Sequence, residues 1–156
     1  MERKVLYNTV KKAILIKFDF LTNKGYEITK IDYADAPYNS KENIENLYIS
    51  FTHIQFKREI KLYYVPFQSE SNIDLHNFSF TIWDKKNMAH IEIGNFMKLR
   101  HKDEYIQLTL RSFEGVFEEK LDQLLDYVVN IMQKYLLDVL EGEKWINVPM
   151  DWGGAK

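Results

Sequence analysis

Apolar residues recur at helical spacing in two segments, one near each end of the chain. Residues 2–22 carry them three or four positions apart, which predicts a first helix, with Leu6, Val10, Ala13, Ile14, Phe18 and Leu21 on one side. Part of this run also alternates as a strand would, but the longer helical period and the Asn23-Lys24-Gly25 ending favour a helix. Residues 116–140 predict a long C-terminal helix ending before Gly142, with an apolar stripe of Phe117, Leu121, Leu124, Leu125, Val128, Ile131, Met132, Tyr135, Leu136 and Val139.

Alternating apolar and polar residues predict strands between these helices. Residues 26–33 predict a first strand with a bulge, because the apolar phase shifts within it. Residues 47–51 predict a second strand, and residues 54–65 predict a long strand with one apolar side. Residues 78–82 and 89–93 predict two strands joined by a hairpin turn at 84–87. Residues 105–110 predict a last strand, with Ile106, Leu108 and Leu110 pointing inward.

Three segments lack a clear pattern. Residues 34–46 and 67–72 are polar and predict loops. Residues 95–104 leave a loop, a short strand and a single helical turn open.

These elements predict an α+β fold. We expect an antiparallel sheet of five or six strands, with the N-terminal helix and the long C-terminal helix packed on one face, because each amphipathic element must bury its apolar side. The 6 glycines and 3 prolines are scattered, so residues 1–156 are expected to form one domain. In the tail, 143–156, the apolar side chains predict partial anchoring, and the last residues are expected to be flexible.

Composition narrows the classes of function. The chain has 156 residues and no cysteine, which excludes disulfides, thiol catalysis and thiolate metal sites. It shows no secretory signal pattern and no apolar run near the ~20 residues that span a bilayer. A net charge of −2 does not favour nucleic acid. We therefore expect a cytoplasmic protein with no nucleic-acid partner and no membrane partner.

Four short motifs stand out along the chain: Phe18-Asp19-Phe20-Leu21 with Gly25-Tyr26, Tyr48-x-Ser50 with Ile54-x-Phe56, Arg58-Glu59-Ile60-x-Leu62, and the ending Leu136-Leu137-Asp138-Val139-Leu140-Glu141-Gly142. They resemble motifs of a group of small, largely uncharacterised bacterial α+β proteins. They cover about half the chain as apolar patterns. Some proteins of that group lie near toxin genes and are suspected immunity proteins. The resemblance implies a bacterial binding protein and assigns no functional residue.

Catalytic and metal-binding patterns are missing. The histidines at 53, 76, 90 and 101 lack the spacing of a local metal site. The predicted strand ends and turns contain Asp32, Asp35 and Asp84, and acidic residues at such positions commonly stabilise the turn. Neither a nucleophile motif nor a phosphate-binding loop occurs. We therefore expect no catalytic residue, no metal, no cofactor and no enzymatic activity.

Arg58 stands out because it interrupts an apolar strand face. If it is buried it needs a partner, and it could then anchor an acidic ligand. A bulge or turn at 57–59 would instead let its long side chain reach water, which is the interpretation we favour.

Four aromatic residues fall on the strand faces opposite the main apolar set: Tyr48, Tyr63, Trp83 and Tyr105. If both helices cover one sheet face, these rings lie on the other, where Tyr and Trp suit an interaction surface. The alternative is that loops and the tail cover them.

Three functions remain open. The first is a binding protein, immunity-like, that blocks a protein partner through its sheet face or loops; the partner would be a toxin, or a second copy in a homodimer. The alternative is a small-molecule-binding protein with an apolar pocket between the long helix and the sheet. The third is an enzyme, which would need carboxylates or histidines to converge in a cleft.

Overall fold

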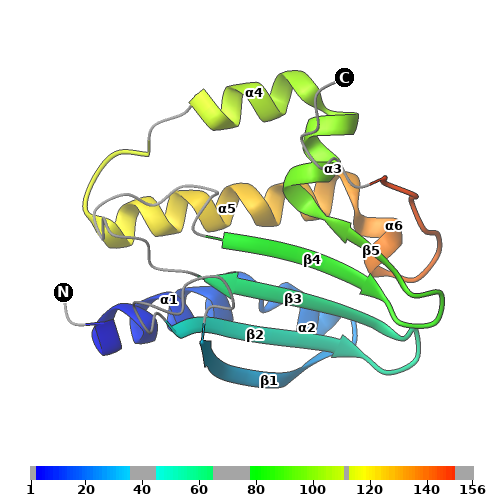
Figure 1. Ribbon diagram of the computed structural model, residues 1–156, viewed down its shortest axis with the longest axis horizontal. Helices are drawn as coiled ribbons and strands as arrows, with labels where there is room; N and C mark the ends of the chain where they lie inside the picture. The colour runs from blue at the N-terminus through cyan, green and yellow to red at the C-terminus, as the bar shows by residue number, and fades with distance from the viewer. Residues whose placement is uncertain (1–2, 36–44, 65–77, 111–112, 150–156) are drawn as a thin grey trace.

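The computed structural model describes residues 3–35, 45–64, 78–110 and 113–149 (Figure 1). Within these ranges the chain forms five strands: β1 (Tyr26–Asp35), β2 (Glu45–His53), β3 (Arg58–Tyr64), β4 (Phe78–Asp84) and β5 (Ala89–Glu92). It also forms six helices: α1 (Arg3–Lys17), α2 (Phe20–Asn23), α3 (Ile93–Arg100), α4 (Lys102–Leu110), α5 (Phe117–Tyr135) and α6 (Leu137–Leu140).

The strands form one antiparallel sheet in the order β1-β2-β3-β4-β5. Each strand therefore pairs with its neighbours along the chain, and the predicted antiparallel sheet is confirmed. The register between β1 and β2 shifts between Ile28 and Lys30, which confirms the predicted bulge. The predicted hairpin turn is also confirmed, because Asp84 at the end of β4 pairs with Ala89 at the start of β5.

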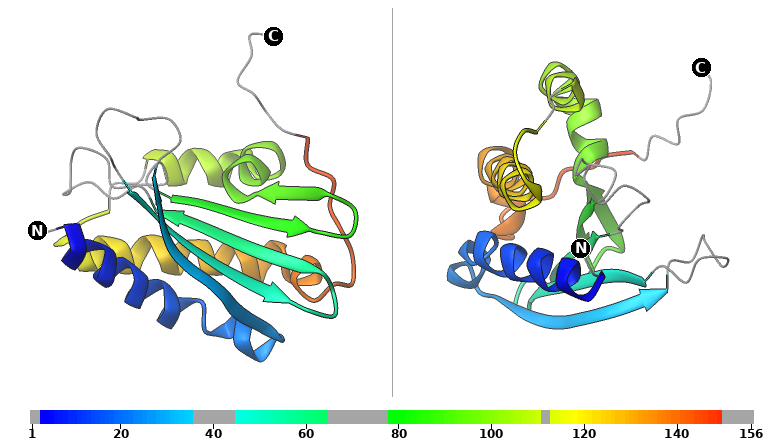
Figure 2. Two further views of the ribbon diagram at one scale, coloured as in Figure 1. Left: turned by 60° about the horizontal axis from the view of Figure 1, so that its bottom comes forward. Right: turned by 90° about the vertical axis from the view of Figure 1, so that its left-hand side faces the viewer.

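Helices α1 and α5 lie side by side on one face of the curved sheet (Figure 2), as predicted. The Lys17 Nζ of α1 lies 2.6 Å from a carboxylate oxygen of Asp122 and 2.7 Å from one of Asp126, both on α5. At the end of the same face, the Tyr26 hydroxyl donates a 2.7 Å hydrogen bond to the Leu140 carbonyl of α6. We call this the inner face and the opposite one the outer face. No helix of the described chain lies over the outer face.

A single buried cluster fills the layer between the sheet and its helices. The predicted stripe of the C-terminal helix is confirmed, since α5 buries Leu121, Leu124, Leu125, Val128, Ile131 and Met132. The strands bury their inner-face side chains against it, including Leu47, Ile49, Phe51, Ile60, Leu62, Phe80 and Ile82. The helix is divided at Leu136 into α5 and α6. Gly142 follows with φ +74°, the left-handed conformation that suits a helix end.

The predicted N-terminal helix is confirmed with one break. Residues 18 and 19 separate α1 from the short α2. Gly25 then leads into β1 with φ +90°, and the predicted transition from helix to strand occurs there.

The predicted strand over residues 54–65 is wrong in its first part. Residues 54–57 form a turn, so β2 and β3 are a hairpin in which His53 pairs with Arg58. Ile54 is 73% exposed. Phe56 keeps the apolar alternation but stacks on the His53 ring, with centroids 3.9 Å apart, rather than entering the core. Beyond the turn, the inner-face side chains of β3 point inward as predicted.

The predicted last strand over residues 105–110 is also wrong, because these residues belong to α4. Residues 95–104, left open above, belong to α3 and α4, apart from His101, which lies between the two helices. Asp103 and Glu104 occupy the first turn of α4, where acidic side chains favour a helix. Ile106 is 40% exposed rather than inward. The side chains of Leu108 and Leu110 lie outside the description.

The tail is anchored in its first part, as predicted. Trp145, Ile146 and Val148 pack, partly buried, against the core. The rest of the tail, 150–156, and most of the two predicted loops lie outside the described residues. None of the described helices combines the length and hydrophobicity needed to cross a bilayer.

Candidate functional site

Three of the four predicted aromatic residues lie on the outer face. Successive strand residues point to opposite sides, so Tyr48 and Tyr63 face away from the core that holds Leu47 and Leu62. The two tyrosines are directly paired across β2 and β3, with ring centroids 4.8 Å apart. Trp83 lies on the same face of β4. Tyr63 and Trp83 are partly exposed, whereas Tyr48 is buried.

A buried carboxylate lies among these rings. Glu59 on β3 is 7% exposed. It accepts hydrogen bonds from the Ser50 hydroxyl at 2.9 Å and from the Tyr48 hydroxyl at 3.3 Å. Its oxygens also lie 2.6 Å from the Lys85 Nζ and 3.8 Å from the Lys61 Nζ. Since a buried charge is costly without partners, this network lets the outer face hold a carboxylate.

The pKa values in this network follow from its contacts. Burial acts to raise the pKa of Glu59, but the bonds from Lys85 and Ser50 and the charge of Lys61 outweigh it, so the pKa lies below its ordinary value. Burial raises the pKa of Tyr48 to about 12. Near neutral pH, Glu59 is therefore an acceptor and Tyr48 a donor. This favours a fixed hydrogen-bond network over a proton-transfer site.

Cationic side chains lie over the aromatic rings. The Lys61 Nζ is 4.8 Å from the Trp83 ring, and the Lys30 Nζ is 5.4 Å from the Tyr48 ring. His90 on β5 stacks on Trp83 with centroids 4.7 Å apart. Contacts of this kind stabilise a cation over a ring face. The outer face thus combines partly exposed rings and lysines with a buried carboxylate.

The prediction that Tyr105 shares this face is wrong. Tyr105 lies on α4 and packs, partly buried, against the core. The error follows from the incorrect strand assignment of residues 105–110. The side to which a side chain points can be inferred only when its residue is assigned to the correct type of secondary structure.

The preferred interpretation of Arg58 is also wrong. A turn does precede it, but Arg58 is on the inner face and only 7% exposed. Its Nη1 donates a 2.7 Å hydrogen bond to the Val139 carbonyl, and its guanidinium lies 4.7 Å from the Trp145 ring centroid. Burial acts to raise the pKa of neighbouring Asp84, but its hydrogen bonds with Asn87 and Lys86, helped by the charge of Arg58, hold the pKa below its ordinary value. The role of Arg58 as a ligand anchor stays a prediction.

The described histidines are dispersed. The buried His53 accepts a 3.2 Å hydrogen bond at Nδ1 from the Phe56 backbone N–H. His90 stacks on Trp83, and His101 stacks on Tyr135 with centroids 3.7 Å apart. His76 lies outside the described residues. Among the carboxylates, Asp84 caps its turn and Glu92 accepts from the first N–H groups of α3, so both have structural partners.

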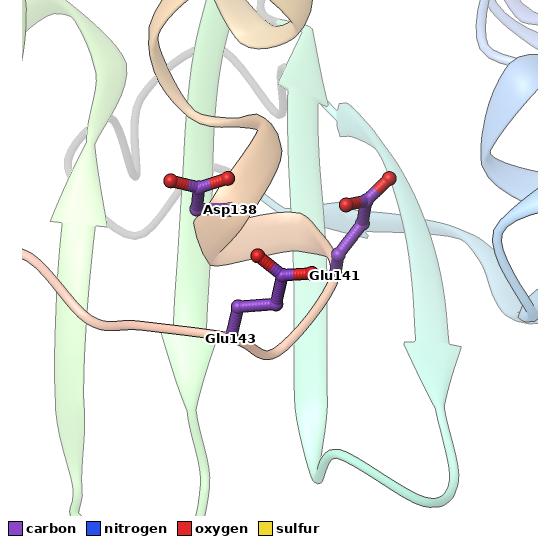
Figure 3. A group of neighbouring side chains, drawn as sticks. All are labelled: Asp138, Glu141 and Glu143. Atoms are coloured by element: carbon purple, nitrogen blue, oxygen red, sulfur yellow. The ribbon is translucent and has the colours of Figure 1, made fainter.

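Three carboxylates meet beside α6: Asp138, Glu141 and Glu143 (Figure 3). One oxygen from each lies within 4.8 Å of the others. Lysines already accompany two of them, with Lys24 at 2.9 Å from Glu141 and Lys144 at 3.4 Å from Asp138. Calcium prefers about six to eight oxygen ligands, so this small, lysine-paired group is better explained as surface charge than as a metal centre.

Sequence reasoning missed Ser50, Glu59, Lys61 and Lys85. A signal for three of them was present: a four-residue turn at 54–57 would have paired Tyr48 with Tyr63 and placed Ser50, Glu59 and Lys61 on the same face. The apolar character of Ile54 and Phe56 concealed that turn. No local pattern indicates that Lys85, in a different hairpin, reaches Glu59.

Comparison of the chain with protein-family models, curated proteins and solved structures finds no match in any of the three.

Proposed function

We propose that this protein binds another protein through the outer face of its sheet, and that it acts by occupying its partner's surface rather than by catalysis. The observation that carries the proposal is the grouping of Tyr63, Trp83 and Lys61 on a sheet face that no described helix covers. The core uses the opposite face, so packing of the helices does not require aromatic residues here.

The composition of the outer face suits a protein partner. Tyr and Trp are enriched at interfaces because they offer large contact areas with few rotatable bonds. The buried Glu59 network holds Tyr48 and the two lysines in place before any partner arrives, which reduces the entropy lost on binding. The toxin partner implied by the resemblance, and a second copy of this chain, both remain within the proposal.

The test is capture of a partner from native lysate, with light scattering to measure the oligomeric state of the protein alone. The changes Tyr63→Ala and Trp83→Ala should each remove a contact at the centre of the face. Truncating such a residue typically costs ~2 kcal/mol or more of binding free energy. We therefore expect the captured partner, or the homodimer, to be lost.

Tyr105→Ala is the matched control, since it removes an aromatic side chain from α4 and should leave binding intact. Thermal melts of all variants check that the fold persists. Equal capture by wild type, the outer-face variants and the control would contradict the proposal, as would a monomer that captures nothing.

The apolar pocket between the long helix and the sheet stays a prediction. The inward side chains of α5 belong to the same buried cluster as those of the strands, and Arg58 lies at the end of this layer beside α6.

A further inference from the structure

Two hairpin turns of four residues each lie next to each other at one end of the sheet (Figure 1). We call residues 54–57 and 85–88 the hairpin tips. The Lys85 N–H donates a 2.9 Å hydrogen bond to the Lys57 carbonyl and so joins the tips. The last residue of each tip has a positive φ, +51° at Lys57 and +55° at Met88.

Each tip is held by a side chain at the end of the preceding strand. The His53 Nδ1 accepts the Phe56 N–H in the first tip. In the second, Asp84 Oδ1 accepts the N–H groups of Lys86 at 3.0 Å and Asn87 at 3.3 Å. These bonds fix the turn backbones, so their outward side chains project from a defined support.

All eight tip residues are exposed, and their composition is unusual for exposed turns. They include three lysines and no acidic residue, together with three large apolar side chains. Ile54 is 73% exposed and Met88 is 80% exposed, while Phe56, which stacks on His53, is 37% exposed. The adjacent carboxylate of Asp84 is buried. The tips therefore present positive charge and apolar groups together.

We propose that the hairpin tips dock this protein onto an anionic lipid bilayer, with Ile54 and Met88 entering the headgroup region and Lys57 and Lys86 contacting lipid phosphates. This contact is peripheral and needs no spanning helix. The expectation of no membrane partner rested on the lack of an apolar span, so it does not concern a peripheral contact of this kind. The proposal does not depend on the outer face, because Lys85, whose Nζ lies 2.6 Å from Glu59, is not one of its lipid contacts.

The arrangement of apolar and basic side chains along the two tips favours a bilayer over an acidic protein as the binding partner. Ile54 begins one tip and Met88 ends the other, while Lys57 and Lys85 lie at the junction. A protein interface has the reverse arrangement, with an apolar centre and a polar rim. A fluid headgroup region has no fixed pockets, so each apolar side chain can enter it separately while the lysines remain near phosphates.

Cosedimentation with vesicles tests the proposal. The purified full chain is mixed with vesicles of phosphatidylcholine alone, or of phosphatidylcholine with phosphatidylserine, at low and high salt. We expect binding to the anionic vesicles that weakens with salt. A lysine near an anionic surface changes membrane partitioning by about fivefold, so the pair Lys57→Gln and Lys86→Gln should reduce it by about 25-fold. The pair Ile54→Ser and Met88→Ser should reduce it by about tenfold or more.

The matched control pairs Ile16→Ser with Lys12→Gln, because Ile16 is also a largely exposed apolar residue, at 64%, on α1. It should bind as wild type does. Lys85 is left unchanged because it also partners Glu59. Failure of the wild type to bind anionic vesicles overturns the proposal, and so does equal binding to both vesicle types or an equal loss in the control. Binding to poly-L-glutamate that needs Lys57 and Lys86, without vesicle binding, would assign the tips to an acidic protein instead.

Discussion

The Arg58 guanidinium and the Val139 carbonyl join the sheet to the end of the last helix, through a hydrogen bond of 2.7 Å that spans 81 positions of sequence. The bond is buried, and the Trp145 ring lies over the same guanidinium. Arg58 therefore connects β3, α6 and the tail at one point. Its position explains why an otherwise apolar strand face tolerates a charge there.

Replacing Arg58 should destabilise the fold strongly. Arg58→Met keeps much of the side-chain stem but leaves the Val139 carbonyl without its donor and the buried Asp84 carboxylate without a neighbouring positive charge. Removing one partner of a buried charged contact costs about 3 kcal/mol. Urea unfolding should show this loss, and Lys57→Met, an exposed neighbour, should stay within about 0.5 kcal/mol of wild type. Equal stability of the two variants would contradict the structural role of Arg58.

Stability should depend on the charge of Glu59 in acid. Its pKa in the folded protein lies below the ordinary value of 4.5. The ionised carboxylate therefore adds stability above that value, and this contribution is lost as the pH falls through the lowered pKa. We expect Glu59→Gln to be less stable than wild type at neutral pH, with the difference shrinking toward low pH. Urea midpoints measured across that range test this, and a difference that stays constant would exclude Glu59 as the source.

Met88 has a backbone conformation that glycine adopts more easily, with φ +55°. Because its side chain is 80% exposed, its removal costs little packing. Relief of the left-handed strain outweighs the added flexibility of the unfolded chain, so Met88→Gly should raise stability by up to about 1 kcal/mol. Lys86→Gly, in the same turn with a negative φ, should lower it. Thermal melts compare the two, and a loss in both would show that Met88 is not strained.

Gly142 should not tolerate a side chain. It has φ +74°, and a Cβ atom there would lie 2.6 Å from the Phe56 ring. Gly142→Ala should cost about 1–2 kcal/mol from the backbone conformation alone, with the contact against Phe56 adding to it. Adding Phe56→Ala removes the contact, so the double variant should lose less than the sum of the two single losses. Chemical denaturation of all four proteins gives the coupling, and strict additivity would rule out the contact.

The order of residues along the chain is sufficient to predict the elements whose apolar side chains follow one period without interruption. The stripe of α5 repeats over 19 residues, and β4 alternates from Phe78 to Ile82. In such segments, burial of one side is possible in only one type of element. These patterns predict the helices near the two ends of the chain, the sheet between them and its antiparallel pairing.

Where a local pattern fits two conformations, contacts with distant parts of the fold select the element that forms. Phe56 keeps strand alternation through a turn because it finds an apolar contact on His53 and Gly142 rather than in the core. Residues 105–110 alternate like a strand but form α4, where Glu104 bonds Lys134 and Tyr135 of α5, distant in sequence.

The candidate sites divide in the same way. Alternation alone placed Tyr48, Tyr63 and Trp83 on one face. The burial of Arg58 and the partners of Glu59 depend on Val139 and Lys85, which belong to other elements. The pattern of neighbouring residues indicates on which side of a helix or strand a side chain lies. The cost of burying a charged side chain depends instead on which groups, distant in sequence, the fold places beside it.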